Sequence, residues 1–155
     1  MLTHIDEKSR PRMVDVAGKG VTRRTASARA YVSLPKAVRG AITGTDIGSE
    51  KGPVFQTAIL AGIMAVKRTG DLIPLCHPLP IDSCDIDITF AADQRVQIDC
   101  TVSVDGKTGV EMEALTGAAV AALTIYDMCK ALSHEIVIQE VRLLRKRGGK
   151  HDVDV

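Results

Sequence analysis

The stretch from Gly109 to Leu132 constrains the fold of this chain more than any other part of the sequence. It is rich in Ala, Val and Leu and reads as one uninterrupted helix. Charged residues stand at both ends, Glu111 and Glu113 at one and Asp127 and Lys130 at the other. These charges serve either solubility or a reaction. Small residues in the middle let another backbone approach closely, and they are Gly117, Ala118, Ala119, Ala121 and Ala122.

Four other segments alternate apolar and polar residues, which is the pattern of strands with one buried face. In the first, Thr25–Leu34, Ala and Val alternate with Thr, Ser and Arg. The next two, Cys84–Phe90 and Val96–Val104, are joined by the short connection AADQ and are predicted to form a hairpin. A last alternating strand is predicted from Ile136 to Lys146.

Two further helices are predicted between the first strand and the hairpin. Pro35 suits the start of a short helix through Ile42, because its missing N–H is no loss at the first helical position. The second helix, Pro53–Thr69, has apolar residues at helical spacing. The intervening Gly44–Gly52 reads as a loop, and prolines exclude a helix from Gly70 to Pro80.

The order of these elements is strand, helix, helix, strand, strand, helix, strand. This is a β-α-β-β-α-β unit with one extra helix. We therefore predict an α+β fold of the ferredoxin-like class, an antiparallel sheet with the helices packed on one face. Residues 1–20 are polar and aperiodic and are expected to form a mobile arm, residues 21–150 a single domain, and residues 151–155 a C-terminal tail.

The charge balance and the cysteines limit the class of function. A net charge of +1 gives no general case for binding nucleic acid or an anionic membrane, and no apolar run is long enough to span one. The four cysteines form no CxxC pair, so we interpret them as free thiols in a reducing cytosol. A ferredoxin-like RNA-binding module would stack bases on aromatic side chains, of which the chain has only two Tyr and two Phe. We expect a cytoplasmic protein.

Asp127 and Lys130 are three residues apart on the long helix and can touch. A solvated ion pair is one interpretation, but the neighbouring residues are mostly apolar, so we expect a partly covered surface. Glu113 lies fourteen residues before Asp127, about 21 Å along a helix axis. If both ends serve one reaction, either loops fold over or a second subunit completes the site. The small residues between the ends favour the second subunit.

His77 stands between a cysteine and a proline in a proline-stiffened segment. It is open to three interpretations: a metal ligand, a structural histidine, or a histidine that contacts substrate or transfers a proton. A zinc site needs two or three more ligands, and Cys84, Cys100 and His4 do not have a recognised spacing. We therefore predict no metal site.

Basic residues occur in loops and at the ends of elements, and they include Lys51, Lys67, Arg68, Arg145, Lys146, Arg147 and Lys150. Most lysines on a surface are merely solvated, but a convergent set would bind a polyphosphate as point charges. The segments DGKTG and RGGK both lack the first glycine of a P-loop, and no Rossmann fingerprint or nucleophile elbow is present. Any polyphosphate would have to be held by scattered lysines.

Three segments together, KRTGDLIPLCHPL, GKTGVEMEALTGAAVAALTIYDMCKA and GGK, resemble the molybdenum cofactor biosynthesis protein C family of cyclic pyranopterin monophosphate synthases. The resemblance runs from Met13 to Lys150. It implies a ferredoxin-like subunit in a homohexamer, built as a trimer of dimers with sites at subunit interfaces. It also implies a cyclised dihydroguanosine triphosphate as substrate, made from GTP by a radical SAM enzyme. The products would be cyclic pyranopterin monophosphate and pyrophosphate.

The resemblance also implies roles for individual residues. The family's catalytic aspartate and lysine fall on Asp127 and Lys130 in YDMCK. A partly dry interface would move the pKa values of this pair toward neutrality, as proton transfer needs. The matching substrate-binding and other site residues are Leu75, Cys76, His77, Met112, Glu113, Lys51, Lys67, Glu111 and Lys146.

Three points are left open by the sequence. No cofactor is certain, although Mg²⁺ commonly accompanies a triphosphate. The family often continues GGK with Ser, Gly, Asp and an aromatic residue, whereas HDVDV follows here, so the resemblance implies no role for the tail in closing the site. A nucleotide-binding regulator without turnover would keep the same lysines, and it differs from an enzyme in not needing Asp127 and Lys130 for chemistry.

Overall fold

The strand β1 (Thr22–Ser33) lies at the centre of the main sheet. In the computed structural model, which describes residues 4–155, β1 pairs antiparallel with β6 (Val96–Gly106) on one side and β7 (Val137–Arg147) on the other. β5 (Ser83–Phe90) pairs with β6, and the short β8 (Val153–Asp154) pairs with β7. The resulting order is β5-β6-β1-β7-β8.

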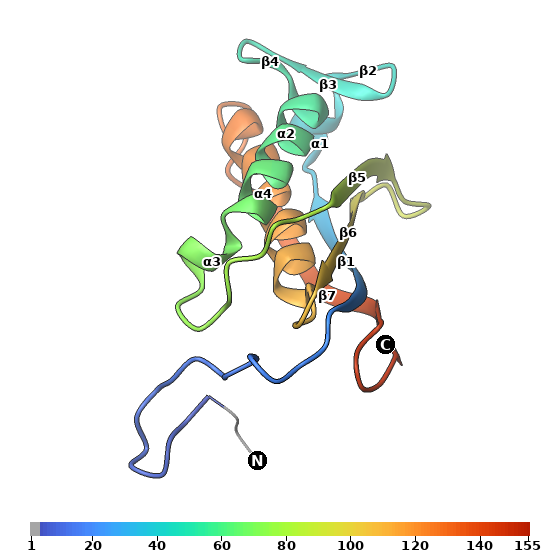
Figure 1. The fold of residues 1–155 in the computed structure, drawn as a ribbon. Coiled ribbons are helices and arrows are strands. Elements are labelled where there is room, and N and C mark those ends of the chain that lie inside the picture. The colour runs from blue at the N-terminus through green and yellow to red at the C-terminus, as the bar shows by residue number, and fades with distance from the viewer. Residues whose placement is uncertain (1–3) are drawn as a thin grey trace.

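Two helices, α2 (Val54–Lys67) and α4 (Glu111–Cys129), cover one face of this sheet (Figure 1). The order along the chain is therefore β1-α2-β5-β6-α4-β7, with β1 between the third and fourth strands of the unit. This confirms the α+β, ferredoxin-like prediction. The buried face of β1 carries Ala26, Ala28 and Ala30, whose short side chains let the helices lie close to the sheet.

The small residues of α4 pack within the same chain. A Cβ atom added at Gly62 of α2 would lie 2.9 Å from the carbonyl oxygen of Gly117 in α4. One added at Gly117 would lie 2.7 Å from Sγ of Cys100 in β6. The inference that these residues favour a second subunit was therefore wrong, because the backbone that approaches them closely is α2.

Short elements account for the other differences from the prediction. Gly44–Gly52, predicted as a loop, contributes to a second small sheet of β2 (Ile42–Thr43), β3 (Asp46–Ser49) and β4 (Gly52–Pro53). Strands of two to four residues are too short to show alternation, and positive φ angles of 63° at Gly44 and 103° at Gly52 make their turns. The helix α1 (Lys36–Arg39) is shorter than the predicted Pro35–Ile42.

A helical turn, α3 (Thr69–Leu72), lies in the stretch where prolines were expected to exclude helix. The prediction was wrong for its first residues because a proline restricts only itself and the residue before it, and Pro74 is the first proline. The chain from Ile73 to Asp82 then runs without helix. The long helix α4 is also shorter at both ends than the predicted Gly109–Leu132.

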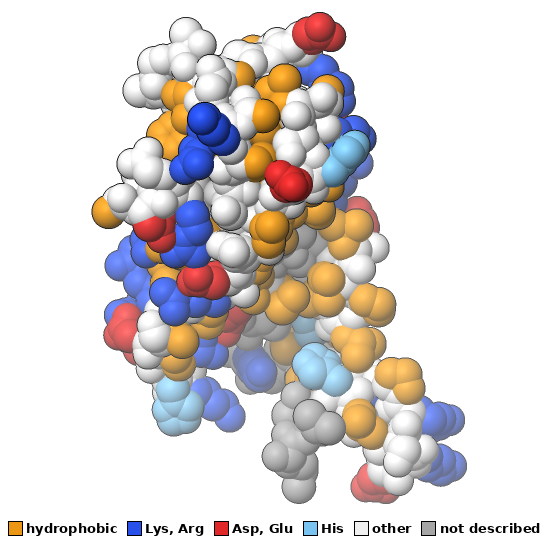
Figure 2. Space-filling view, turned by 180° about the vertical axis from the view of Figure 1, so that it is seen from behind, with side chains coloured by type: hydrophobic (Ala, Val, Ile, Leu, Met, Phe, Trp, Pro, Cys, Tyr) orange, Lys and Arg blue, Asp and Glu red, His pale blue; other side chains and the backbone are white. Residues whose placement is uncertain are grey.

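The open face of the sheet carries polar pairs between β1 and β6. The hydroxyl groups of Ser27 and Thr101 are 2.8 Å apart, and Arg29 donates two hydrogen bonds to Asp99. Seen from behind, basic and acidic side chains lie next to one another (Figure 2). The one aromatic side chain of β1, Tyr31, is covered by the guanidinium of Arg95 at 4.0 Å. This face therefore offers no stacking platform of the kind that RNA-binding modules use.

The N-terminal arm from residue 4 onward and the turn before β8 lie toward the same end of the molecule (Figure 1). Residues 1–3 of the predicted arm lie outside the described residues. Further along the arm, an isolated bridge joins Ile5 and Pro11. At the other end, β8 lies within the predicted tail, and Arg147 donates to both carboxylate oxygens of Asp154. The turn before β8 is thereby held beside β7.

Candidate active site

A pocket of about 800 Å³ opens at the start of α4. Its walls come from the N-terminal arm, the start of β1, the segment after α3, the turn before α4 and the end of β7. It brings together seven of the residues that the sequence indicated, namely Leu75, Cys76, His77, Glu111, Met112, Glu113 and Lys146. Residues far apart in the sequence therefore converge in one pocket.

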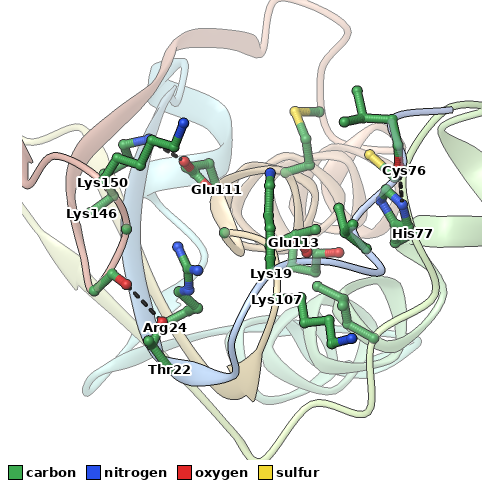
Figure 3. Close-up of a pocket in the computed structure, with 18 of the residues that line it drawn as sticks. Lys19, Thr22, Arg24, Cys76, His77, Lys107, Glu111, Glu113, Lys146 and Lys150 are labelled. Atoms are coloured by element: carbon green, nitrogen blue, oxygen red, sulfur yellow. Dashed lines mark hydrogen bonds and ion pairs between the residues drawn. The ribbon is translucent and has the colours of Figure 1, made fainter. Parts of the chain in front are cut away.

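The pocket also contains basic residues that the sequence analysis did not assign to the site. Lys19, Arg24 and Lys107 line it, together with Lys150, which had been noted only as part of a basic segment. Figure 3 shows Lys19 extending across the pocket from the arm. Lys19 and Lys107 stand next to glycines, as in GKG and DGKTG, but this signal is too common to identify a site. Only the fold shows that these cations converge.

Glu111 and Lys146 form an ion pair at the pocket, with 2.8 Å between Oε1 and Nζ. Glu111 is the first residue of α4, and Lys146 pairs with Ala26 in the sheet. The absence of a side chain at Gly109 makes room for this carboxylate, since a Cβ there would lie 1.9 Å from Oε2 of Glu111. The pair therefore fixes the direction of the Lys146 ammonium.

Glu113 is the most deeply buried acid near the pocket, with 3% of its surface exposed. Burial raises its pKa, because a low-dielectric surrounding disfavours the charged carboxylate. The pKa of the Cys76 thiol is raised too, first by burial and then by the charge of Glu113. Glu113 can therefore take up a proton more readily than an exposed glutamate.

His77 contacts the N-terminal arm. Its Nε2 lies 2.8 Å from the carbonyl oxygen of Val14. Because a carbonyl only accepts, Nε2 must carry the hydrogen and donate it. The structural interpretation and the substrate-contacting interpretation of His77 are thus compatible, since the side chain holds the arm and also lines the pocket.

A second cluster lies at the other end of α4, around Asp127. Its Oδ1 is 2.7 Å from Nζ of Lys130, and its Oδ2 is 2.9 Å from Nζ of Lys51. Hydrogen bonds from Lys130 and Lys51 lower the pKa of Asp127 to about 2, and the hydrogen bond to Asp127 raises the pKa of Lys130. In the single chain both pKa values thus move away from neutrality, opposite to the expectation for a partly dry interface. The reason is that both side chains are about half exposed, so attraction outweighs desolvation.

The pocket and the Asp127 cluster lie at opposite ends of α4. Glu113 and Asp127 are fourteen residues apart in this helix, which corresponds to about 21 Å. Lys67 belongs to neither group. It is exposed at the last turn of α2. The pKa of the Cys84 thiol is lowered chiefly by a hydrogen bond with Cys100, and the charge of Lys67 adds to this effect. One chain therefore presents two separate clusters of predicted site residues.

The part of the chain that the structure describes contains no group of three His, Cys, Asp or Glu residues able to hold a metal ion. None of the helices described is long and apolar enough to cross a membrane. The four cysteines are free, with Cys100 and Cys129 buried and Cys76 and Cys84 partly buried.

Comparison with known proteins places the two clusters in a family. A family model described as the MoaC family matches residues 13–149, which include the pocket-lining segments and the Asp127 cluster. The chain belongs to the MoaC family. The match ends just before Lys150, so the last part of the C-terminal turn and β8 lie beyond the region that defines the MoaC family.

Curated relatives cover nearly all of this chain. Cyclic pyranopterin monophosphate synthase of Xanthomonas oryzae pv. oryzae is 55% identical over 152 residues, which are 98% of this chain and 92% of that protein. The molybdenum cofactor biosynthesis bifunctional protein of Synechocystis is 54% identical, over 99% of this chain but 45% of its own length. Molybdenum cofactor biosynthesis protein 1 of Dictyostelium discoideum is 49% identical, over 96% of this chain and 26% of its own length. The MoaC unit thus occurs both alone and within longer proteins.

Proposed function

We propose that this chain is a cyclic pyranopterin monophosphate synthase of molybdenum cofactor biosynthesis. It converts the cyclised dihydroguanosine triphosphate to cyclic pyranopterin monophosphate and releases pyrophosphate. The relatives' names and the MoaC match support this reaction. The observation that carries it is the convergence of basic side chains on one pocket that also holds a buried carboxyl group.

The phosphate chemistry follows from the substrate and the products. A cyclic monophosphate forms when a hydroxyl oxygen of the sugar bonds to the α-phosphorus and the bond from that phosphorus to the pyrophosphate breaks. The hydroxyl must lose a proton, and the leaving pyrophosphate gains negative charge. Lysines near the phosphate chain stabilise this charge as point charges. Lys51, Lys67 and Lys146 are assigned to this role, and Glu111 orients Lys146.

The Asp127–Lys130 pair is the proposed catalytic pair. Asp127 keeps Lys130 protonated, since its charge raises the pKa of that ammonium. Lys130 therefore enters the reaction as a general acid, and it becomes a base after giving up its proton. The segment Leu75–His77, with Met112 and Glu113, holds the rest of the substrate in the pocket. Mg²⁺ would accompany the triphosphate as part of the substrate rather than as a resident metal.

A complete site on this proposal needs two chains. The pocket and the Asp127 cluster are about 21 Å apart along α4, which is too far for one small substrate to touch both. A two-fold axis can bring the pocket of one subunit against the Asp127 cluster of another. We propose the homohexamer, a trimer of dimers, as the assembly that does so, and the cytoplasm as its location.

The deciding experiment is incubation of the protein with the cyclised intermediate, followed by mass spectrometry of the products. The proposal expects equal amounts of cyclic pyranopterin monophosphate and pyrophosphate. The alternative, a nucleotide-binding regulator, expects the intermediate to be recovered unchanged although it binds. Lys130→Ala, which leaves the pocket residues in place, is the matched inactive variant, and Lys36→Ala in α1 is a control for loss of a surface charge.

A further inference from the structure

Residues 13–20 of the N-terminal arm lie against the pocket. Val14 and Val16 are partly buried and line it, whereas Met13 and Asp15 between and beside them are exposed. The segment therefore has an inner and an outer face, as an extended chain does when it lies on a surface. Lys19 follows on the same segment and also lines the pocket.

Two side chains from distant parts of the chain donate hydrogen bonds to the backbone of this segment. His77 Nε2 lies 2.8 Å from the carbonyl oxygen of Val14, and Lys107 Nζ lies 3.0 Å from that of Ala17. His77 belongs to the proline-rich segment after α3, and Lys107 to the turn before α4. The arm is thus attached at two points, to two separate segments that line the pocket.

The arm makes a turn between Asp15 and Lys19. The amide of Ala17 donates to the Asp15 side chain at 2.8 Å, and the amide of Lys19 donates to the carbonyl oxygen of Val16 at 3.0 Å. This turn aims the side chain of Lys19 into the pocket (Figure 3). The direction of Lys19 therefore depends on the arm being held in this place.

We propose that His77 and Lys107 are positioning residues that latch residues 13–20 over the pocket and so place Lys19 against the phosphate chain of the substrate. The ligand in this statement rests on the proposed function, whereas the latch does not. His77 lines the pocket and also acts on the arm through Nε2, and this second contribution to the reaction is made through Lys19. Lys107 acts in the same way from the turn before α4.

The test uses hydrogen exchange in the free, full-length protein, read on peptides that cover residues 13–20. His77→Leu and Lys107→Met each remove one donor and should speed exchange of the Ala17 and Lys19 amides about five- to tenfold, the factor expected for loss of one hydrogen bond. His77→Gln keeps a terminal N–H donor at similar reach, so it should leave exchange close to wild type. His134→Leu, an exposed histidine outside the pocket, is the matched control.

Kinetics with the cyclised intermediate then test the link to Lys19. Lys19→Met and His77→Leu should each raise KM with a smaller effect on kcat, and the double variant should be little worse than either single variant. His77→Gln should restore most of the turnover lost in His77→Leu. Such non-additivity is expected only if one residue acts through the other.

Three outcomes would overturn the proposal, the first by removing the latch and the other two by removing its link to Lys19. Unchanged exchange of the arm in both donor variants would show that His77 and Lys107 do not hold it. If the effects of Lys19→Met and His77→Leu on KM simply add in the double variant, the two residues act independently. A His77→Gln protein with a protected arm but no turnover would place His77 in the chemistry. If the wild type fails to convert the intermediate, the proposed function fails, yet hydrogen exchange still decides the latch.

Discussion

Lys130 donates to Asp127 across one turn at the end of α4, with 2.7 Å between Nζ and Oδ1, while Lys51 occupies the other carboxylate oxygen at 2.9 Å. The aspartate thus stands between two ammonium groups. Both lysines lie outside the pocket at the start of α4, which holds seven of the other predicted site residues. The chemistry proposed for Asp127 and Lys130 therefore depends on Lys51 and on the pocket residues as well as on the pair itself.

The first prediction concerns this pair. Lys130→Ala should lower turnover by about 10²–10⁴-fold, the usual loss when a general acid or base is removed, with the fold intact. Asp127→Asn should lower the pKa of Lys130, because the carboxylate is what raises it. The NMR shift of the Lys130 Nζ group against pH measures this change. A wild-type rate in Lys130→Ala would rule out its assignment.

The second prediction concerns Glu111 and Lys146. Glu111→Gln releases the Lys146 ammonium, and we expect KM for the cyclised intermediate to rise about two- to tenfold, a range suited to a partly exposed ion pair. Gly109→Ala should have a similar effect, since its methyl group would displace the same carboxylate. Gly40→Ala, where contacts stay at 3.6 Å, is the control. If added salt leaves KM unchanged in all variants, the phosphates are not held by these charges.

The third prediction concerns Glu113 and pH. Burial raises its folded-state pKa above the unfolded value, so its contribution to stability is fully present below the unfolded pKa of about 4.3 and is lost as pH rises through the folded pKa. Glu113→Gln should remove this loss. Thermal unfolding from pH 4 to pH 8 should therefore show a smaller decline of Tm in the variant. Parallel curves for both proteins would contradict a carboxyl group whose pKa is raised by burial.

The fourth prediction concerns the contact between α2 and α4. Alanine normally stabilises a helix interior relative to glycine by about 1 kcal/mol. At Gly117 we expect the opposite, a loss of about 1–3 kcal/mol in the free energy of unfolding, because the added methyl group meets Val66 at 2.6 Å and Cys100 at 2.7 Å. Urea unfolding of the wild type and of Gly117→Ala measures this difference in the free energy of unfolding. Gly117→Ala combined with Cys100→Ala should recover part of the loss if the clash is the cause.

The fifth prediction concerns the shared site. A variant altered at Lys130 and another altered at His77 are each expected to be inactive or weak, and mixing them with subunit exchange should restore part of the activity. Recovery is expected because some mixed dimers contain one site with both residues intact. No recovery despite proven exchange would place His77 and Lys130 in the same subunit's contribution. The arrangement proposed for this pair would then be wrong.

Much of the fold could be predicted because its strands alternate clearly. The buried faces of β1 and β6 show this in Ala26, Ala28 and Ala30 and in Ile98 and Cys100, all fully buried. The small sheet β2–β4 escaped prediction because its strands are too short for a period to appear. The prediction that Gly117 faces a second subunit was wrong, because a small residue on a helix indicates a close neighbour but does not identify it.

The candidate site could also be predicted only in part. The family resemblance indicated Glu111, Glu113 and His77, and the fold brings them to one pocket. Lys19 and Arg24 could not be assigned from one sequence, because a single lysine or arginine looks the same on any surface and convergence is a property of the folded chain. The Val14 carbonyl is a still clearer case. It is a backbone group, so no residue type marks it as the acceptor of His77.

The helix α4 has a consequence for how sequences of this kind can change in length. In the proposed shared-site assembly, α4 carries half of one site at its first turn and half of another at its last, so its length sets the distance between them. One inserted residue would lengthen it by about 1.5 Å and rotate one end against the other by about 100°. In a symmetric assembly that error would repeat in every copy and misalign all the sites together. Loops can tolerate insertions and deletions, but the interior of this helix must keep its number of residues.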